Sequence, residues 1–132
     1  MFYYGVDMKE YKNKTILLTG ASTGIGYAMA HLLADQGANL IITARGRDKL
    51  EDLAKELHDK KIQTHIFTQD ISEANSAKKL FDQIEQANLS VDLLINNAGY
   101  GRWGEFTEID MQDYENMIQL NVTSLTELSY LY

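Results

Sequence analysis

Short apolar runs alternate with segments of helical periodicity along this chain, and the alternation occurs four times. The runs at residues 15–19, 39–43, 63–68 and 92–96 have the length and β-branched content of buried strands. Strands separated by helices are joined by right-handed parallel crossovers, so the sheet carries helices on both faces. The pattern therefore predicts an α/β fold, a doubly wound, Rossmann-like parallel sheet of four strands with about four helices.

The helical segments each place apolar residues at spacings of three and four. The first is predicted to follow the first strand directly and to end at Gly37. Ser72 is expected to cap the third helix, and the last is predicted to begin near Asp110 and to be still running at Tyr132. The apolar stripes are Ile25, Met29, Leu32 and Leu33; Leu50, Leu53, Ala54 and Leu57; Ala77, Leu80, Phe81 and Ile84; and Tyr114, Met117, Ile118, Asn121, Leu125 and Leu128.

Composition narrows the choice of partners. The 132 residues suffice for one compact domain, and with a net charge of −7 and no Lys/Arg cluster we expect no nucleic-acid or membrane partner. The lack of cysteine excludes disulfides and zinc–thiolate sites and is compatible with a cytoplasmic location. The three histidines are scattered, so no metal site is predicted. Residues 1–7 lack the features of a signal peptide, and residues 1–11 are expected to be a tail.

A glycine-rich turn with the sequence TGASTGIG joins the first strand to the first helix at residues 19–26. Gly20 permits the sharp turn, Gly24 lets the main chain approach a pyrophosphate, and Gly26 lets the helix pack closely on the sheet. The helix N-terminus offers N–H groups and a positive dipole to phosphates. The residues of this turn expected to bind a cofactor are Gly20, Ser22, Thr23, Gly24, Ile25 and Gly26. For this motif in isolation, a glycine turn without a ligand is the alternative.

The glycine spacing is G-x-x-x-G-x-G, which differs from the dinucleotide fingerprint G-x-G-x-x-G. Further motifs follow the later strands in order, namely Arg45, Asp70-Ile71, Asn96-Asn97-Ala98-Gly99 and, in the last helix, Asn121-Val122. Together these motifs resemble those of the short-chain dehydrogenase/reductase family, from about Lys12 to the C-terminus. The resemblance implies a single, incomplete NAD(P)-binding domain over residues 1–132, with strands in the order 3-2-1-4.

The resemblance also implies roles for the motifs that follow the third and fourth strands. Asp70, with Ile71 beside it, corresponds to the carboxylate that accepts a hydrogen bond from the adenine amino group, the alternative being a solvated turn residue. Asn97, Ala98 and Gly99 correspond to the stretch that lines the cofactor ribose. A tight turn is the alternative for this stretch, because Asn and Gly both favour one.

Arg45 favours NADP over NAD. Proteins that select NAD usually place an acidic residue about twenty residues beyond the glycine turn, where it binds the ribose 2′-OH. Here that place holds Arg45, with Arg47 nearby and no acid before Asp48. A guanidinium binds a 2′-phosphate that a carboxylate would repel. Many NADP-binding members of the family carry a second basic residue in the glycine turn, where this chain has Thr23, and a merely solvated Arg45 is the alternative.

The family's reaction uses a Ser, and a Tyr followed four residues later by a Lys. The Tyr exchanges a proton with the substrate oxygen, the Lys lowers the pKa of the Tyr, and the Ser orients the carbonyl. No Tyr of this chain has a Lys four residues later. We therefore expect the catalytic half to be absent and this chain to be inactive. Asn121 corresponds to the family's Asn that helps hold a proton-relaying water, whereas a hydrogen bond at the core edge is the alternative.

The resemblance implies an NADP-dependent oxidoreductase of a small carbonyl or alcohol substrate. Without the strand that follows in the family, the strand at 92–96 becomes a sheet edge, and we expect a homo-oligomer. The loop with Tyr100, Arg102, Trp103 and Phe106 is expected either to contact substrate or to pack on the last helix. A non-catalytic dinucleotide sensor is one alternative function. A methyltransferase that binds S-adenosylmethionine is another, but the Asn-Asn-Ala-Gly motif argues against it.

Overall fold

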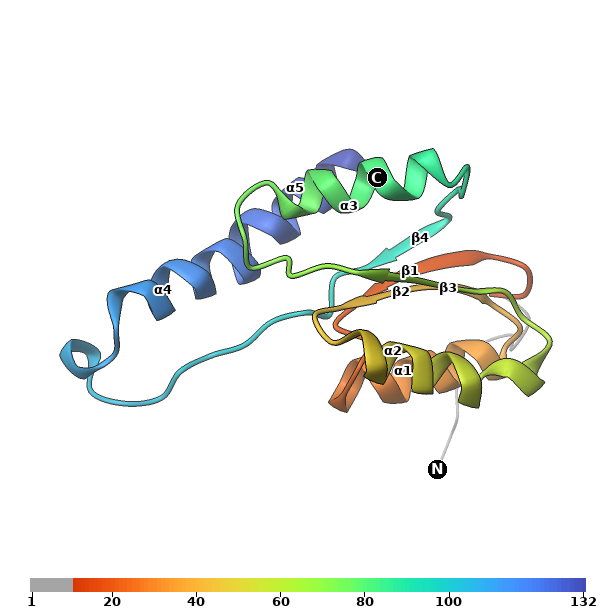
Figure 1. Ribbon diagram of the computed structural model, residues 1–132, viewed down its shortest axis with the longest axis horizontal. Coiled ribbons are helices and arrows are strands. Elements are labelled where there is room, and N and C mark those ends of the chain that lie inside the picture. Colours follow the sequence, from red (N-terminus) through yellow and green to blue (C-terminus); the bar gives the residue numbers. More distant parts are fainter. Residues whose placement is uncertain (1–10) are drawn as a thin grey trace, which may run out of the picture.

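The computed structural model describes residues 11–132 and contains a parallel four-stranded sheet in the order β3-β2-β1-β4 (Figure 1). Its strands are β1 (Thr15–Thr19), β2 (Asn39–Ala44), β3 (Thr64–Thr68) and β4 (Leu93–Ile95). The predicted doubly wound α/β fold and the predicted strand order are confirmed. The tail expected at residues 1–11 lies, except for Tyr11, outside the described residues.

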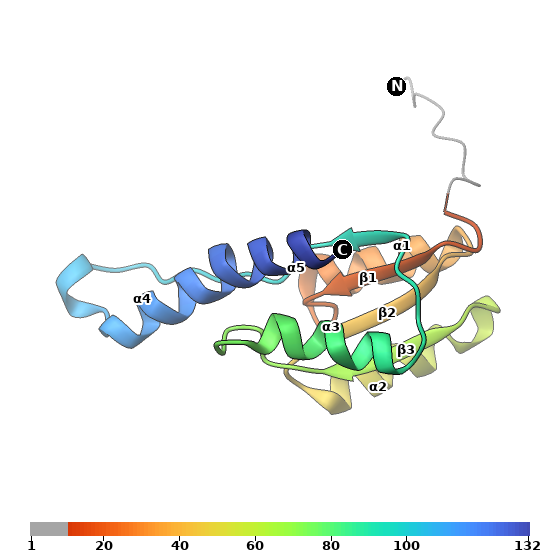
Figure 2. The same cartoon turned by 90° about the horizontal axis from the view of Figure 1, so that it is seen from above.

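Helices cover both faces of the sheet. The elements on one face are α1 (Gly24–Asp35) and α2 (Arg47–Glu56), and those on the other are α3 (Ser76–Gln86) and α5 (Leu125–Leu131) (Figures 1 and 2). The remaining helical elements are α4 (Met111–Ile118), the π-helical η3 (Gln119–Ser124), and the short 3-10 turns η1 (His58–Lys60) and η2 (Phe106–Glu108). A π segment thus interrupts the single helix predicted from Asp110 to Tyr132, and α4 with the loop before it extends beyond the sheet (Figure 2).

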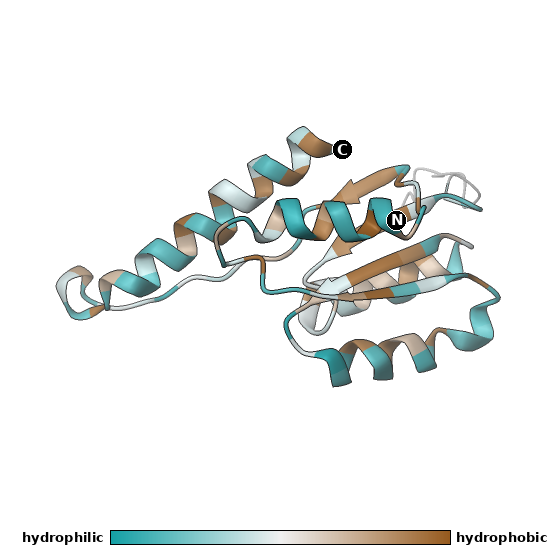
Figure 3. Cartoon of the chain, turned by 45° about the horizontal axis from the view of Figure 1, so that its top comes forward, coloured by the Kyte–Doolittle hydropathy of each residue, from teal (hydrophilic) through white to brown (hydrophobic). Residues whose placement is uncertain are grey.

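The core consists of two apolar layers because side chains alternate between the faces of a strand. Figure 3 shows the apolar strands between the two helical layers. The strand residues that face α1 and α2 are Ile16, Leu18, Leu40 and Ile42. The strand residues that face α3 and α5 are Leu17 and Ile41. All six are fully buried, which explains why β1 and β2 are apolar without interruption.

The predicted burial of the two outer strands is wrong. Every residue of β3 is partly or fully exposed, and Leu93 at the start of β4 is 37% exposed. Both strands form edges of the sheet, so each has a neighbour on one side only. The β4 strand is also shorter than the predicted run of residues 92–96. Asp92 uses its carboxylate to accept a hydrogen bond from the N–H of Thr15 at 2.8 Å.

The stripe predicted for the first helix is half wrong: Leu33 is buried and Met29 packs partly buried on the core, but the other two residues are exposed. Ile25 is 74% exposed and Leu32 is 62% exposed, whereas the buried face consists of Gly26, Ala30, Leu33 and Ala34. Small residues on that face let α1 lie close to the sheet. The bulkier Ile25 and Leu32 face outward, although they are more conspicuous in the sequence. The stripes predicted for α2 and α3 are confirmed, since Leu50, Leu53, Leu57, Ala77, Leu80 and Ile84 are fully buried.

Of the predicted helix ends, the cap at Ser72 is wrong. The α3 helix begins at Ser76, after Asn75 with a φ of 62°. Ser72 instead donates from its N–H and its hydroxyl to one carboxylate oxygen of Asp70, at 2.9 and 2.6 Å. The other two ends are confirmed: Gly37 has a φ of 80° and donates to the carbonyl of Ala34, and the Asp110 carboxylate accepts from the N–H of Gln112 at 2.8 Å.

Candidate functional site

A cleft of about 490 Å³ lies where the four parallel strands reach their carboxyl ends. Open α/β sheets bind their ligands at this place. The predicted site residues that line it are Gly20, Ser22, Thr23, Ile25, Arg45, Asp70, Ile71, Asn97, Ala98 and Gly99. The predicted residues Gly24, Gly26 and Asn121 do not line the cleft. Tyr100, from the aromatic loop, also lines it, and the lining residues that sequence reasoning missed are Thr43, Ala44, Gly46, Lys49, Gln69, Ser72 and Leu120.

The glycine turn requires glycine at residues 20 and 26. Gly20 has a φ of 67° and donates its N–H to the carbonyl of Thr43 at 2.9 Å, which ties the turn to β2. A Cβ atom added to Gly26 would lie 2.2 Å from the carbonyl oxygen of Gly20. Thr23 precedes α1 and its side chain makes no capping hydrogen bond, so the first N–H groups of the helix are available to an anion.

Thr19 and Asn97 connect the ends of β1 and β4. The Thr19 hydroxyl accepts hydrogen bonds from the N–H groups of Asn97 and Ala98, at 3.0 and 2.9 Å. The Asn97 amide donates to the carbonyls of Thr19 and Gly20, at 3.0 and 3.2 Å. Asn97 therefore fixes the glycine turn. The role of Thr19 was missed, and the signal in the sequence is a hydroxyl at the end of an otherwise apolar strand.

Asp70 lines the cleft, and one of its two carboxylate oxygens has no hydrogen-bond partner among the described residues. Its Oδ1 accepts both hydrogen bonds from Ser72, and within residues 11–132 its Oδ2 accepts none. The next residue, Ile71, is almost fully buried in the core and anchors the turn. This arrangement leaves Oδ2 oriented by its partner oxygen and able to accept a hydrogen bond from a ligand amino group.

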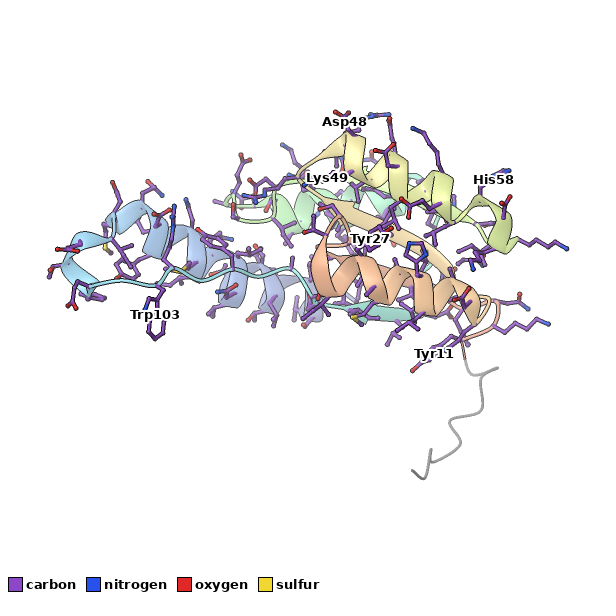
Figure 4. The ribbon with its side chains drawn as sticks, turned by 90° about the horizontal axis from the view of Figure 1, so that it is seen from below. Tyr11, Tyr27, Asp48, Lys49, His58 and Trp103 are labelled. Atoms are coloured by element: carbon purple, nitrogen blue, oxygen red, sulfur yellow. The ribbon has the colours of Figure 1, made fainter. Side chains whose placement is uncertain are left out.

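Two cations and one anion make up the charged lining of the cleft. The cations are Arg45 and Lys49, and the anion is Asp70. Within the described part of the chain neither cation forms an ion pair, whereas Arg47 pairs with Glu51 at 2.7 Å and does not line the cleft. Lys49 belongs to the first turn of α2 (Figure 4). Its place in the cleft lining depends on how α2 lies on the sheet, which the sequence alone does not specify.

Asn121 lies within η3 and contacts the wall of the cleft. Its side chain accepts a hydrogen bond from the N–H of Tyr100 and donates one to the carbonyl of Tyr100. Asn121 is exposed, and both of these hydrogen bonds are made to main chain. Departures from α-helical geometry of this kind are frequent at functional sites.

The aromatic loop after β4 packs mainly on α4. The hydroxyl of Tyr100 donates to the carbonyl of Asp113 at 3.4 Å, and Arg102 pairs with the Asp113 carboxylate at 3.2 Å. The ring of Phe106 lies 4.8 Å from that of Tyr114, centroid to centroid. Trp103 differs because its side chain is fully exposed (Figure 4). Of the two alternatives expected for this loop, packing on the last helix describes most of it.

The pKa values of two tyrosines, Tyr27 and Tyr132, are raised, which makes their hydroxyl groups weaker acids. Burial, with a smaller contribution from Glu85, raises the pKa of Tyr132 to about 12. A hydrogen bond to Glu56 raises the pKa of the exposed Tyr27. Among residues 11–132 no three acidic or histidine side chains gather as a metal site would require. None of the described helices combines the length and hydropathy of a membrane span.

Known proteins resemble this chain in sequence and in fold. The family model described as short chain dehydrogenase matches residues 14–132. An uncharacterised oxidoreductase of Bacillus subtilis (strain 168) is 39% identical over 97 residues, which are 74% of this chain and 36% of the relative. The chain spans half or less of the length of such curated relatives.

Two solved structures superpose closely on this fold. A short-chain dehydrogenase of Sphingobium yanoikuyae, in complex with NADPH, is 31% identical with a TM-score of 0.82 and covers 89% of this chain and 46% of its own. An alcohol dehydrogenase of the archaeon Thermococcus sibiricus, complexed with 5-hydroxy-NADP, is 30% identical with a TM-score of 0.84. That match covers 92% of this chain and 52% of the archaeal one.

Proposed function

Since this chain belongs to the short-chain dehydrogenase family of oxidoreductases, we propose that it is the cofactor-binding portion of an NADP-dependent enzyme. The enzyme interconverts the carbonyl and alcohol groups of a small-molecule substrate. The observation that carries the proposal is the cleft, where the glycine turn and Asp70 meet two cations that form no ion pair with residues 11–132. The alcohol dehydrogenase relative, complexed with an NADP derivative, supports the same reaction class.

The residues of the cleft fit the parts of a dinucleotide. The uncapped N–H groups at the start of α1 suit the pyrophosphate, and the free Oδ2 of Asp70 suits the adenine amino group. Ala98 and Gly99 leave room for a ribose against the main chain beyond β4. The bound cofactor supplies the hydride of the reaction, and the protein supplies its position and electrostatic environment.

NADP is preferred over NAD because Arg45 lines the cleft and no acidic residue replaces it. A carboxylate that binds the ribose 2′-OH would repel a 2′-phosphate, whereas the guanidinium binds it with charge-assisted hydrogen bonds. Each such contact contributes roughly 1.5–3 kcal/mol. The only acidic residue that lines the cleft, Asp70, has one oxygen occupied by Ser72.

The catalytic Ser, Tyr and Lys belong to the part of the enzyme that this chain lacks. No Tyr of the chain has a Lys four residues later. Asn121 is a positioning residue, because it fixes the main chain of Tyr100 at the cleft wall. The complete enzyme assembles as a homo-oligomer. The exposed apolar side chains along the last helix support this, among them Ile118, Val122 and Leu125.

Titration of the protein with NADPH and NADH tests the proposal. We expect NADPH to bind at least tenfold more tightly, because a difference of 1.4 kcal/mol is a factor of about ten. The Arg45→Asp variant should reverse the order. Arg47→Gln serves as control, since Arg47 pairs with Glu51 outside the cleft. Equal affinities would contradict the NADP preference, and failure to bind either dinucleotide would contradict the proposed function itself.

A further inference from the structure

Lys49 differs from the other cations of α2 in its surroundings. Arg47 pairs with Glu51 at 2.7 Å, and Lys55 pairs with Asp52 at 3.0 Å. Both of these pairs lie on the exposed surface of the helix. Within residues 11–132 Lys49 forms no ion pair, and it lines the cleft together with Arg45. The acidic neighbour, Asp48, does not line the cleft (Figure 4).

Three sources of positive potential meet at this corner of the cleft. Arg45 and Lys49 carry full charges, and α2 adds the positive end of its dipole. The residue before that helix is Gly46, which has no side chain that could cap the first N–H groups. The only negative charge among the lining residues is Asp70, beyond the end of β3. In a chain with a net charge of −7 such a corner is unusual, and it favours an anionic group.

We propose that Lys49 is a second cation for the 2′-phosphate of NADP, which it binds together with Arg45. This inference rests on the proposed function. A phosphate monoester carries close to two negative charges and three acceptor oxygens. The planar guanidinium of Arg45 suits two of these oxygens, and the ammonium of Lys49 suits the third as a point charge. Lys49 thereby replaces the basic residue that Thr23 does not provide from the glycine turn.

Adenosine 2′,5′-bisphosphate and adenosine 5′-monophosphate isolate the contribution of the 2′-phosphate, and calorimetric titration measures the affinity for each. Lys49→Gln should weaken binding of the bisphosphate about tenfold and leave the monophosphate within about twofold. Gln matches Lys in helix propensity, so α2 is retained. Lys55→Gln is the matched control on the same helix and should change neither affinity. Lys49→Arg should restore selectivity for the bisphosphate.

The possible results separate the role of Lys49 from the proposed function. If Lys49→Gln keeps the selectivity of the unmodified protein, Lys49 is not a 2′-phosphate ligand, while the NADP preference stands. If Lys49→Gln weakens both nucleotides equally, the side chain acts on the fold and the inference is wrong. If the unmodified protein binds both nucleotides equally, the NADP preference and the role of Lys49 fail together. If it binds neither nucleotide, the proposed function fails as well.

Discussion

Asn121 binds both main-chain polar groups of Tyr100: its Oδ1 accepts from the N–H at 3.2 Å, and its Nδ2 donates to the carbonyl at 2.8 Å. A Cβ atom on the preceding residue, Gly99, would lie 3.0 Å from the same Oδ1. Because Tyr100 lines the cleft and Asn121 belongs to η3, the position of the cleft wall depends on the last helix.

Replacing Asn121 by Leu should release the main chain of Tyr100. Two hydrogen bonds disappear, and we expect a loss of about 1–2 kcal/mol in the free energy of unfolding. Hydrogen exchange at the amide of Tyr100 should accelerate. The control is Asn116→Leu, because the one hydrogen bond of the Asn116 side chain among the described residues is with Gln112 on the same helix. Equal exchange rates at Tyr100 in the two variants would contradict this account.

Gly26→Ala should destabilise the protein more than the addition of a single methyl group suggests. The new Cβ would lie 2.2 Å from the Gly20 carbonyl oxygen and 2.5 Å from the amide nitrogen of Asn97. Neither neighbour can yield without opening the turn, so we expect a loss of about 3 kcal/mol in urea unfolding and weaker dinucleotide binding. Gly101→Ala meets no atom within 4 Å and should change stability by less than about 0.5 kcal/mol. Similar urea midpoints of unfolding for the two variants would contradict this expectation, because they would show that α1 can move away from the glycine turn.

The 132-residue chain should turn over no carbonyl substrate, although it should still bind cofactor. Its tyrosines lack a Lys four residues later, and the pKa values of Tyr27 and Tyr132 are raised rather than lowered. The measurement follows NADPH absorbance with a panel of ketones and aldehydes. Steady oxidation above a protein-free blank would prove this expectation wrong.

The isolated chain should associate with itself. The β4 strand is an edge of the sheet, and Trp103, Val122 and Tyr130 expose apolar surface along the loop after β4 and the last helix. Edges and apolar surfaces of this kind recruit other chains. Size-exclusion chromatography with light scattering should detect a dimer or a larger species at tens of micromolar. A monodisperse species near 15.0 kDa would contradict the expectation.

The fold could be predicted from the sequence wherever the buried residues are also large apolar ones. The central strands β1 and β2 and the buried face of α2 were predicted because large apolar residues mark them. The buried face of α1 was predicted only at Leu33, because the rest of it is Gly26 and small alanines, whereas the exposed Ile25 and Leu32 are more conspicuous. Ser72 was misassigned because its N–H and hydroxyl donate to Asp70, a local alternative to helix capping.

The candidate site was predictable as a set of motifs but not as a set of contacts. Each motif except Asn121-Val122 follows a parallel strand, and parallel strands bring their carboxyl ends to one edge of the sheet. Lys49 was missed because it comes from a helix whose rotation on the sheet decides which side chains reach the cleft. Thr19 was missed because its partners, Asn97 and Ala98, are almost eighty residues away. The roles of Arg45 and the other cleft residues in binding stay predictions.

The π-helical segment Gln119–Ser124 lets the two halves of the last helix keep separate rotational phases. Met117, just before this segment, and Asn121, in its first half, contact the main chain of the loop after β4. Ser124, its last residue, donates to the carbonyl of Ile71, and Leu128 beyond it is buried against the sheet. Each residue turns an α-helix by about 100°. Deleting one residue here would therefore rotate one half against the other and break one set of contacts without altering any side chain that makes them. The number of residues in this segment therefore matters as much for these contacts as the identity of the residues that make them.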